Sequence, residues 1–241
     1  MPGAPLLDPM PEGGALAMKI LALETAGSAC SVALWCDGAV VARRFEAMAH
    51  GQAERLVPMI AEVLDQAGLT VGAVDRLAVT VGPGAFTGIR VGLATARGLA
   101  LAVDRPLVGV TTFAAIGHAL DPEARRGRTV LVAVDSRRAE VFVQCFGPGP
   151  APAGEPLLLS PAACAGWLPP GPLLVAGCGA AALRAALARR PDTVFAEGPG
   201  LPDSGAVAEL AARLAPGTGL PPRPLYLRAP DATLPGEAGR R

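Results

Sequence analysis

The chain has 241 residues, with 21 basic and 21 acidic side chains and therefore no formal net charge. Apolar residues make up 51% and charged residues 17%, which excludes a chain disordered throughout and binding of nucleic acid by charge alone. The five cysteines show no CxxC spacing, and neither His50 nor His118 belongs to an HxxxH or HExxH pair, so we expect neither a disulfide scaffold nor a metal site. Prolines interrupt the longest uncharged stretch, Pro156–Leu183, and residues 1–17 lack the basic start of a signal peptide, so we expect no membrane segment.

The first half of the chain alternates apolar runs with helical patterns. Asp37-Gly38 marks a hairpin turn, because glycine accepts the positive φ of a primed turn. Pro58 should kink its helix or mark a late start. The predicted order is three strands, helix, strand, helix, strand and helix, over Ile20–Glu24, Ser31–Trp35, Val40–Phe45, His50–Gln66, Leu77–Val81, Thr87–Val103, Leu107–Val110 and Thr111–Leu120.

The second half repeats this order. Its predicted elements are Val130–Asp135, Glu140–Phe146, Pro156–Leu159, Pro161–Trp167, Leu173–Ala176, Gly179–Arg190, Thr193–Ala196 and Ser204–Leu214. The pattern predicts an α/β protein with a duplicated βββαβαβ unit. We expect an N-terminal domain over 18–120 and a C-terminal domain over 121–228. A disordered extension over 1–17 and a mobile tail over 229–241 should flank them.

Each half opens with a strand that ends in an acid and a hydroxyl. These pairs are Glu24-Thr25 and Asp135-Ser136, and two domains side by side would bring both to one central cleft. Such turns could hold a metal–phosphate group, or they could simply cap the strand ends, and the residues alone favour caps. Arg137 weakens the nucleotide hypothesis, because a tight phosphate-binding turn favours glycine at this place.

Residues 82–100 form the most distinctive segment, GPGAFTGIRVGLATARGLA. It lacks the Gly-Lys-Ser/Thr of a P-loop and misses the dinucleotide-binding glycine spacing by one position. Small residues recur every four positions along the predicted helix, at Gly88, Gly92, Ala96 and Ala100. Such a stripe permits close helix packing, either against the His50–Gln66 helix or at a subunit interface, and spacing alone does not choose between them.

Five segments together resemble the TsaB (YeaZ) family. They are ILALETAGSACSVALW at 20–35, His50-Gly51-Gln52 with Leu56-Val57-Pro58, the segment at 82–100, VDSRRAEVF at 134–142, and Tyr226-Leu227-Arg228. The resemblance extends from Met18 to about Arg228, and the GPGAFTGIR motif is its most specific part. In two places the chain departs from the family, because Glu24 replaces the usual Asp and the residues before Met18 have no counterpart.

The resemblance implies the two-domain actin/Hsp70/sugar-kinase (ribonuclease H-like) fold. It also implies a non-catalytic scaffold subunit for N6-threonylcarbamoyladenosine formation at position 37 of tRNA. Such a subunit pairs with the transferase TsaD, allows the ATPase TsaE to join, and meets tRNA through the complex. Metal and ATP are then expected on the partner subunits and none on this chain. We expect no catalytic residue, and a protein of the cytoplasm.

The family also implies that the two helices at His50–Gln66 and Thr87–Val103 form the pairing surface. The expected interface residues are Leu56, Met59, Ile60, Val63, Gly88, Gly92, Ala96 and Ala100. On this view Gly92→Leu or Ala96→Arg should abolish pairing and leave the monomer folded. Two alternatives stay open: an enzyme of the same fold, either a nucleotide-dependent phosphotransferase or a metalloprotease-like protein, and a homodimeric regulator that uses the same helix face.

Overall fold

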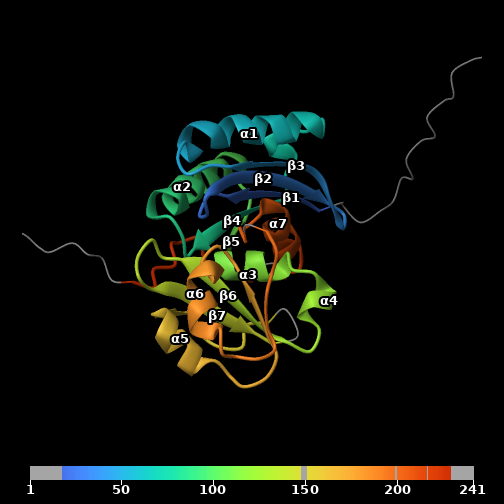
Figure 1. Ribbon diagram of the computed structural model, residues 1–241. Helices are drawn as coiled ribbons and strands as arrows, with labels where there is room; N and C mark the ends of the chain where they lie inside the picture. The colour runs from blue at the N-terminus through green and yellow to red at the C-terminus, as the bar shows by residue number, and fades with distance from the viewer. Residues whose placement is uncertain (1–17, 148–150, 199, 216, 229–241) are drawn as a thin grey trace, which may run out of the picture.

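A computed structural model describes residues 18–147, 151–198, 200–215 and 217–228, and it contains two five-stranded sheets (Figure 1). The first sheet has the order β3-β2-β1-β4-β5, in which β1, β2 and β3 are antiparallel and β4 and β5 run parallel to β1. Its strands are β1 (Lys19–Glu24), β2 (Ala29–Cys36), β3 (Ala39–Ala47), β4 (Arg76–Gly82) and β5 (Leu107–Thr111).

The second sheet has the order β10-β9-β6-β7-β8. Numbered along the chain within each sheet, the strands of both sheets have the same order, 3-2-1-4-5. Its strands are β6 (Thr129–Asp135), β7 (Val141–Phe146), β8 (Leu157–Leu159), β9 (Leu173–Ala176) and β10 (Thr193–Phe195). Here too the first three strands are antiparallel and the last two run parallel to the first. The predicted duplicated α/β unit is therefore confirmed.

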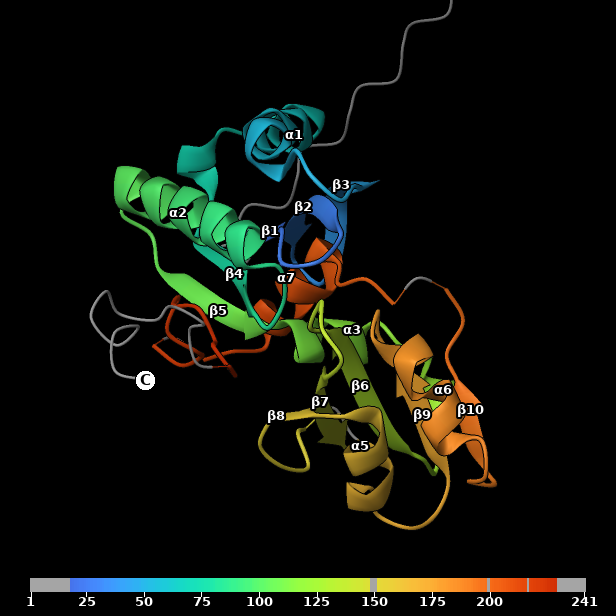
Figure 2. The ribbon, with the colours of Figure 1, turned by 60° about the vertical axis from the view of Figure 1, so that its left-hand side comes forward.

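Helices cover the outer face of each sheet. On the first sheet these are α1 (Gln52–Gln66) and α2 (Phe86–Val103), and the short 3-10 helix η1 (Val71–Ala73) connects α1 to β4. On the second sheet they are α5 (Pro161–Trp167) and α6 (Ala180–Leu187) (Figure 2). Each helix turns its apolar side to the strands, as the period of its apolar residues predicts.

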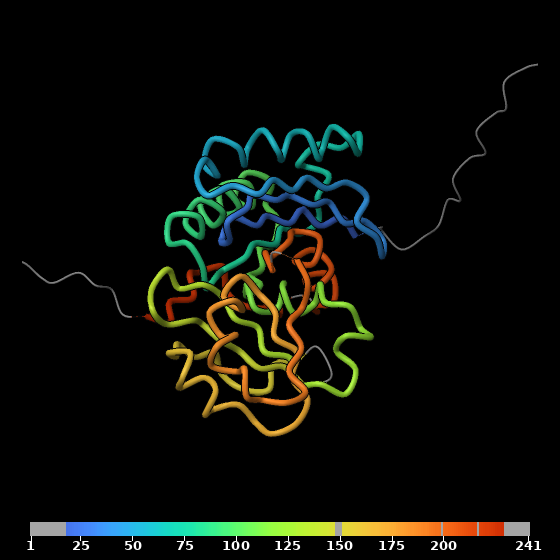
Figure 3. The backbone as a smooth tube through the Cα atoms, in the orientation of Figure 1, coloured from blue at the N-terminus to red at the C-terminus, as the bar shows by residue number. Residues whose placement is uncertain are grey.

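Two further helices fill the space between the sheets. In α3 (Thr112–His118), Ala115 packs on the first sheet while Phe113 and Ile116 pack on the second. In α7 (Ser204–Ala212), Val207 and its neighbours pack against the inner face of the first sheet. Figure 3 shows this return of the chain toward the first sheet after the second is complete. The proposed domain limits stay a prediction, and α7 lies within 121–228 while packing on the first sheet.

Most elements agree with the sequence prediction to within one or two residues. Pro58 does not delay its helix, because α1 begins at Gln52 and continues to Gln66, with buried apolar side chains on both sides of the proline. The short helix α4 (Pro122–Arg125) has no counterpart in the prediction. The expectations for 1–17 and 229–241 lie outside the described residues.

Candidate functional site

The turns that follow β1 and β6 meet at a small cavity of about 210 Å³ between the two sheets. Residues from both turns line it, among them Gly27, Ser28, Asp135 and Arg137. The structure thus brings together the two acid-and-hydroxyl turns that the sequence repeats. What they can do depends on which of their atoms are already engaged.

Glu24 and Thr25 bond to the protein itself. The Gly27 amide donates to Glu24 Oε1 at 2.8 Å, and Thr25 Oγ1 donates to the Gly88 carbonyl oxygen at 2.7 Å. The Glu24 side chain is wholly buried, and this burial raises its pKa to about 7 against the opposing effect of its hydrogen bonds. Glu24 therefore closes its own turn through Oε1, its Oε2 is buried without a hydrogen-bond partner among the described residues, and the side chain does not line the cavity.

Asp135 and Ser136 of the second half also bond to the protein, here within their own loop. The Arg137 amide donates to Asp135 Oδ1 at 2.8 Å, and Ser136 Oγ donates to the Glu140 carbonyl oxygen. Arg137 then reaches across the cleft, where its Nη2 donates to Ser28 Oγ at 2.7 Å. A guanidinium thus spans the space in which a metal–phosphate group would have to bind.

Three glycines of the 82–100 segment, Gly84, Gly88 and Gly92, pack closely on the first turn. A Cβ at Gly84 would overlap the Ala26 carbonyl oxygen, and a Cβ at Gly88 would overlap that of Thr25. A Cβ at Gly92 would lie 2.5 Å from Thr25 Oγ1. Of the two alternatives for the small-residue stripe, internal packing therefore describes Gly88 and Gly92, and their partner is the turn after β1.

The other residues expected at a partner interface are also turned inward. Leu56, Met59, Ile60 and Val63 of α1 are buried against the first sheet, as is Ala96 of α2, and Ala100 is half-buried. Gly92→Leu and Ala96→Arg would consequently disturb the core, so we no longer expect these variants to leave the monomer folded. Any pairing surface on these helices must lie on their opposite faces.

Those opposite faces expose apolar side chains. Val57 of α1 is 60% exposed and Leu101 of α2 is 85% exposed, and Gly98 and Ala94 lie one and two turns before Leu101. A Cβ at Gly98 would meet no atom within 4 Å. These residues were not predicted from the sequence, although the i, i+4, i+7 spacing of 94, 98 and 101 is a signal that could have identified them.

Two features of the part of the chain that the structure describes bear on metal binding and on membranes. Among the described residues there is no group of three or more His, Cys, Asp or Glu side chains arranged to hold a metal ion. Helix α2 has the length and the mean hydropathy, 1.3, of a membrane-spanning helix, which is weak evidence by itself. One side of α2 packs on the first sheet through Ile89, Leu93 and Ala96.

Comparison with known proteins gives three consistent similarities. The family model described as TsaD, tRNA N6-adenosine threonylcarbamoyltransferase, matches residues 46–152. The tRNA threonylcarbamoyladenosine biosynthesis protein TsaB of Escherichia coli is 42% identical over 126 residues, which is 52% of this chain and 53% of that protein. The chain thus spans about half the length of the curated relatives that it matches. A transferase of Sphingopyxis alaskensis is 44% identical over 77 residues, 32% of this chain and 22% of that protein.

Two sheets of one strand order, each with an outer helix layer and with matching acid turns at a shared cleft, define a two-domain protein of the actin/Hsp70/sugar-kinase class. A solved structure of YeaZ from Pseudomonas aeruginosa matches with a TM-score of 0.73 and 31% identity, covering 87% of this chain and all of that one. The chain belongs to the TsaB (YeaZ) family.

Proposed function

We propose that this chain is the non-catalytic partner subunit of a tRNA-modifying complex that forms N6-threonylcarbamoyladenosine at position 37. In this proposal it pairs in the cytoplasm with a TsaD-like transferase and allows a TsaE-like ATPase to join. Membership of the TsaB family supports the pathway, and so does the similarity to the E. coli threonylcarbamoyladenosine biosynthesis protein. The similarity to TsaD over 46–152 supports an origin shared with the proposed partner.

The observation that carries the pairing proposal is Gly98. Glycine inside a helix costs about 1 kcal/mol relative to alanine. At Gly88 and Gly92 close contacts with the Thr25 turn offset that cost, but a Cβ at Gly98 would point into open space. A helix from another subunit that approaches closely here would supply the missing reason, and the exposed Leu101, one turn further along α2, would supply apolar area, as would the exposed Val57 of α1.

The same surface accounts for the homodimer alternative. Two copies of the chain could cover Leu101 and Val57 mutually when the partner is absent, so homodimer and heterodimer would compete for one face. We further propose that the chain binds neither a metal nor ATP of its own, since Glu24, Thr25, Asp135 and Ser136 bond within the protein and Arg137 spans the cleft. Calorimetric titration with Mg-ATP and with divalent metals tests this, and tight binding of either would favour the enzyme alternative.

The pairing surface is tested with Leu101→Asp and Ala94→Arg. Both side chains are exposed, so the monomer should keep its circular dichroism spectrum and unfolding midpoint. Affinity for the TsaD-like subunit should fall about thirtyfold or more, as expected when a central apolar contact is lost. Val194→Asp is the matched control, because Val194 is an exposed apolar residue on β10 and outside the proposed face. Unchanged co-elution of both variants with the transferase would refute the surface.

A reconstitution experiment tests the role as a whole. Modification of tRNA by TsaD-like and TsaE-like proteins should require this chain and should fail with Leu101→Asp in the same measure as pairing fails. If the two partners modify tRNA equally well without the chain, the scaffold function is contradicted.

A further inference from the structure

A second exposed feature lies at the other end of α2, where two aromatic side chains and an arginine form a stack. Phe86 is 58% exposed and Tyr226, the one tyrosine of the chain, is 51% exposed. Their ring centroids are 6.0 Å apart with an interplanar angle of 29°. The Arg90 guanidinium carbon lies 3.3 Å from the Phe86 centroid and 5.9 Å from that of Tyr226. A chain with only 4% aromatic residues thus exposes two of them side by side.

The stack is fixed in place on both sides. Phe86 begins α2, directly after the glycine turn that packs on Ala26. Tyr226 follows Leu225, whose amide donates to the Val81 carbonyl oxygen at 2.8 Å and so holds the C-terminal segment beside β4. The rings are therefore preorganised, which lowers the entropic cost of binding a ligand.

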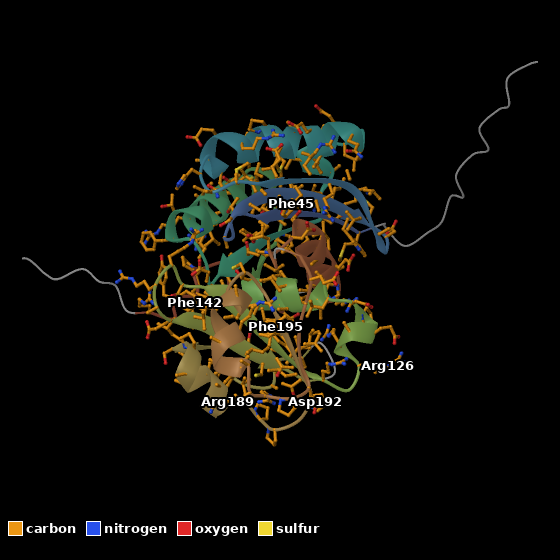
Figure 4. The ribbon with its side chains drawn as sticks, in the orientation of Figure 1. Phe45, Arg126, Phe142, Arg189, Asp192 and Phe195 are labelled. Carbon is orange, nitrogen blue, oxygen red and sulfur yellow. The ribbon has the colours of Figure 1, made fainter. Side chains whose placement is uncertain are left out.

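The stack borders a cavity of about 550 Å³ that has a positive rim. The described residues that line it include three arginines, Arg90, Arg137 and Arg228, and no carboxylate. Arg137 and Arg228 each have an acidic neighbour, Asp135 at 3.7 Å and Glu140 at 3.0 Å. Arg90 has only its ring contacts among the interactions of the described residues. Phe142 supplies an apolar wall from β7 (Figure 4).

We propose that this Phe86–Arg90–Tyr226 platform binds an unpaired stretch of RNA, with a base stacked on the rings and a phosphate beside the arginines. Proteins recognise single-stranded RNA by stacking unpaired bases on aromatic and arginine planes and by neutralising phosphates. A regular duplex would keep its bases stacked inside and would offer only phosphates to three arginines. The inference rests on the proposed function, because nucleotide 37 of a tRNA lies in an unpaired loop.

The platform is distinct from the proposed pairing surface. Phe86 and Leu101 are fifteen residues apart on α2, or about 22 Å at 1.5 Å per residue. The two surfaces can therefore be tested by separate variants. A chain that pairs with the transferase through Leu101 would keep the platform free for the tRNA of the same complex.

The test is fluorescence anisotropy of a labelled anticodon stem–loop RNA titrated with the full chain at low ionic strength. Phe86→Ala and Tyr226→Ala should each weaken binding about tenfold, within the range of single-base stacking. Arg90→Gln should weaken binding and reduce the slope of log affinity against log salt concentration by about one. A fully paired duplex of the same length should compete poorly, and so should AMP.

Two variants control for nonspecific effects. Trp167→Ala removes another partly exposed aromatic residue, and Arg126→Gln removes an exposed arginine on the opposite side of the molecule from Phe142 (Figure 4). Both should bind as the wild type does. The proposal is overturned by wild-type affinity in the Phe86 and Tyr226 variants, by absence of saturable binding, by equal competition from the duplex, or by displacement with AMP. Co-elution of the same variants with the transferase is measured separately, so that a failure of RNA binding can be distinguished from a failure of the proposed pairing.

Discussion

At the end of β1, Glu24 holds a carboxyl group entirely out of water, with one oxygen bonded to the Gly27 amide. Burial disfavours the charged form, so the pKa rises from 4.5 to about 7. The folded protein thus binds this proton more tightly than the unfolded chain does. Raising the pH from 4.5 to 7 should therefore lower the free energy of unfolding, by about 3 kcal/mol from this group.

The Glu24→Gln variant should lose this part of the pH dependence, because glutamine keeps an oxygen that accepts from Gly27 and carries no charge. Urea unfolding just below pH 4.5 and just above pH 7 measures the difference between the two proteins. Arg55 lowers the pKa values of Glu46 and Glu62 through hydrogen bonds. Their contribution to the free energy of unfolding is lost toward acid pH, and this loss should be equal in wild type and Glu24→Gln. Glu123→Gln is the exposed control. Equal slopes in wild type and Glu24→Gln would contradict the assignment.

At the scale of one element, α2 has an inner and an outer glycine that should respond in opposite ways to one methyl group. Gly98→Ala should raise the free energy of unfolding by up to about 1 kcal/mol, because it adds helix propensity and meets no atom. Gly92→Ala should lower it by about 2 kcal/mol, because its Cβ collides with Thr25 Oγ1. Chemical denaturation of both variants gives the comparison, and a change of the same sign in both would refute the two-faced description.

The same helix shows what the sequence could and could not predict. Periodicity located α2 to within one residue, because an apolar run of this length has few alternatives. Periodicity could not show which part of the protein packs on each face of α2, because the Thr25–Gly88 contact joins residues 63 positions apart. The small-residue stripe was therefore compatible with two interpretations. The acid turns were similarly found by repetition alone, but their engagement depends on Gly27, Arg137 and Ser28, which only the folded geometry brings together.

At the scale of the whole molecule, the two halves are linked where α7 packs on the first sheet. Arg76 of β4 donates from Nη1 to the Leu214 carbonyl oxygen at 2.9 Å, and the Ser204 amide donates to Ser31 Oγ at 3.0 Å. Val207 is wholly buried beside β1. The first sheet thus completes its core with residues that follow the second sheet, while α3 packs on both. Two halves connected in this way should unfold together.

The two tryptophans can test this cooperativity, since Trp35 lies in β2 and Trp167 in α5. In Trp167→Phe and Trp35→Phe, the remaining emission reports on one half each, and both should give the same urea midpoint. Adding Val207→Asp to each variant buries an unpaired charge under the first sheet. It should lower the free energy of unfolding by several kcal/mol and lower both urea midpoints together. Ala182→Asp, on the exposed side of α6, should leave both midpoints in place. If Val207→Asp lowers only the midpoint reported by Trp35, the second half folds independently, and α7 stabilises the first half alone.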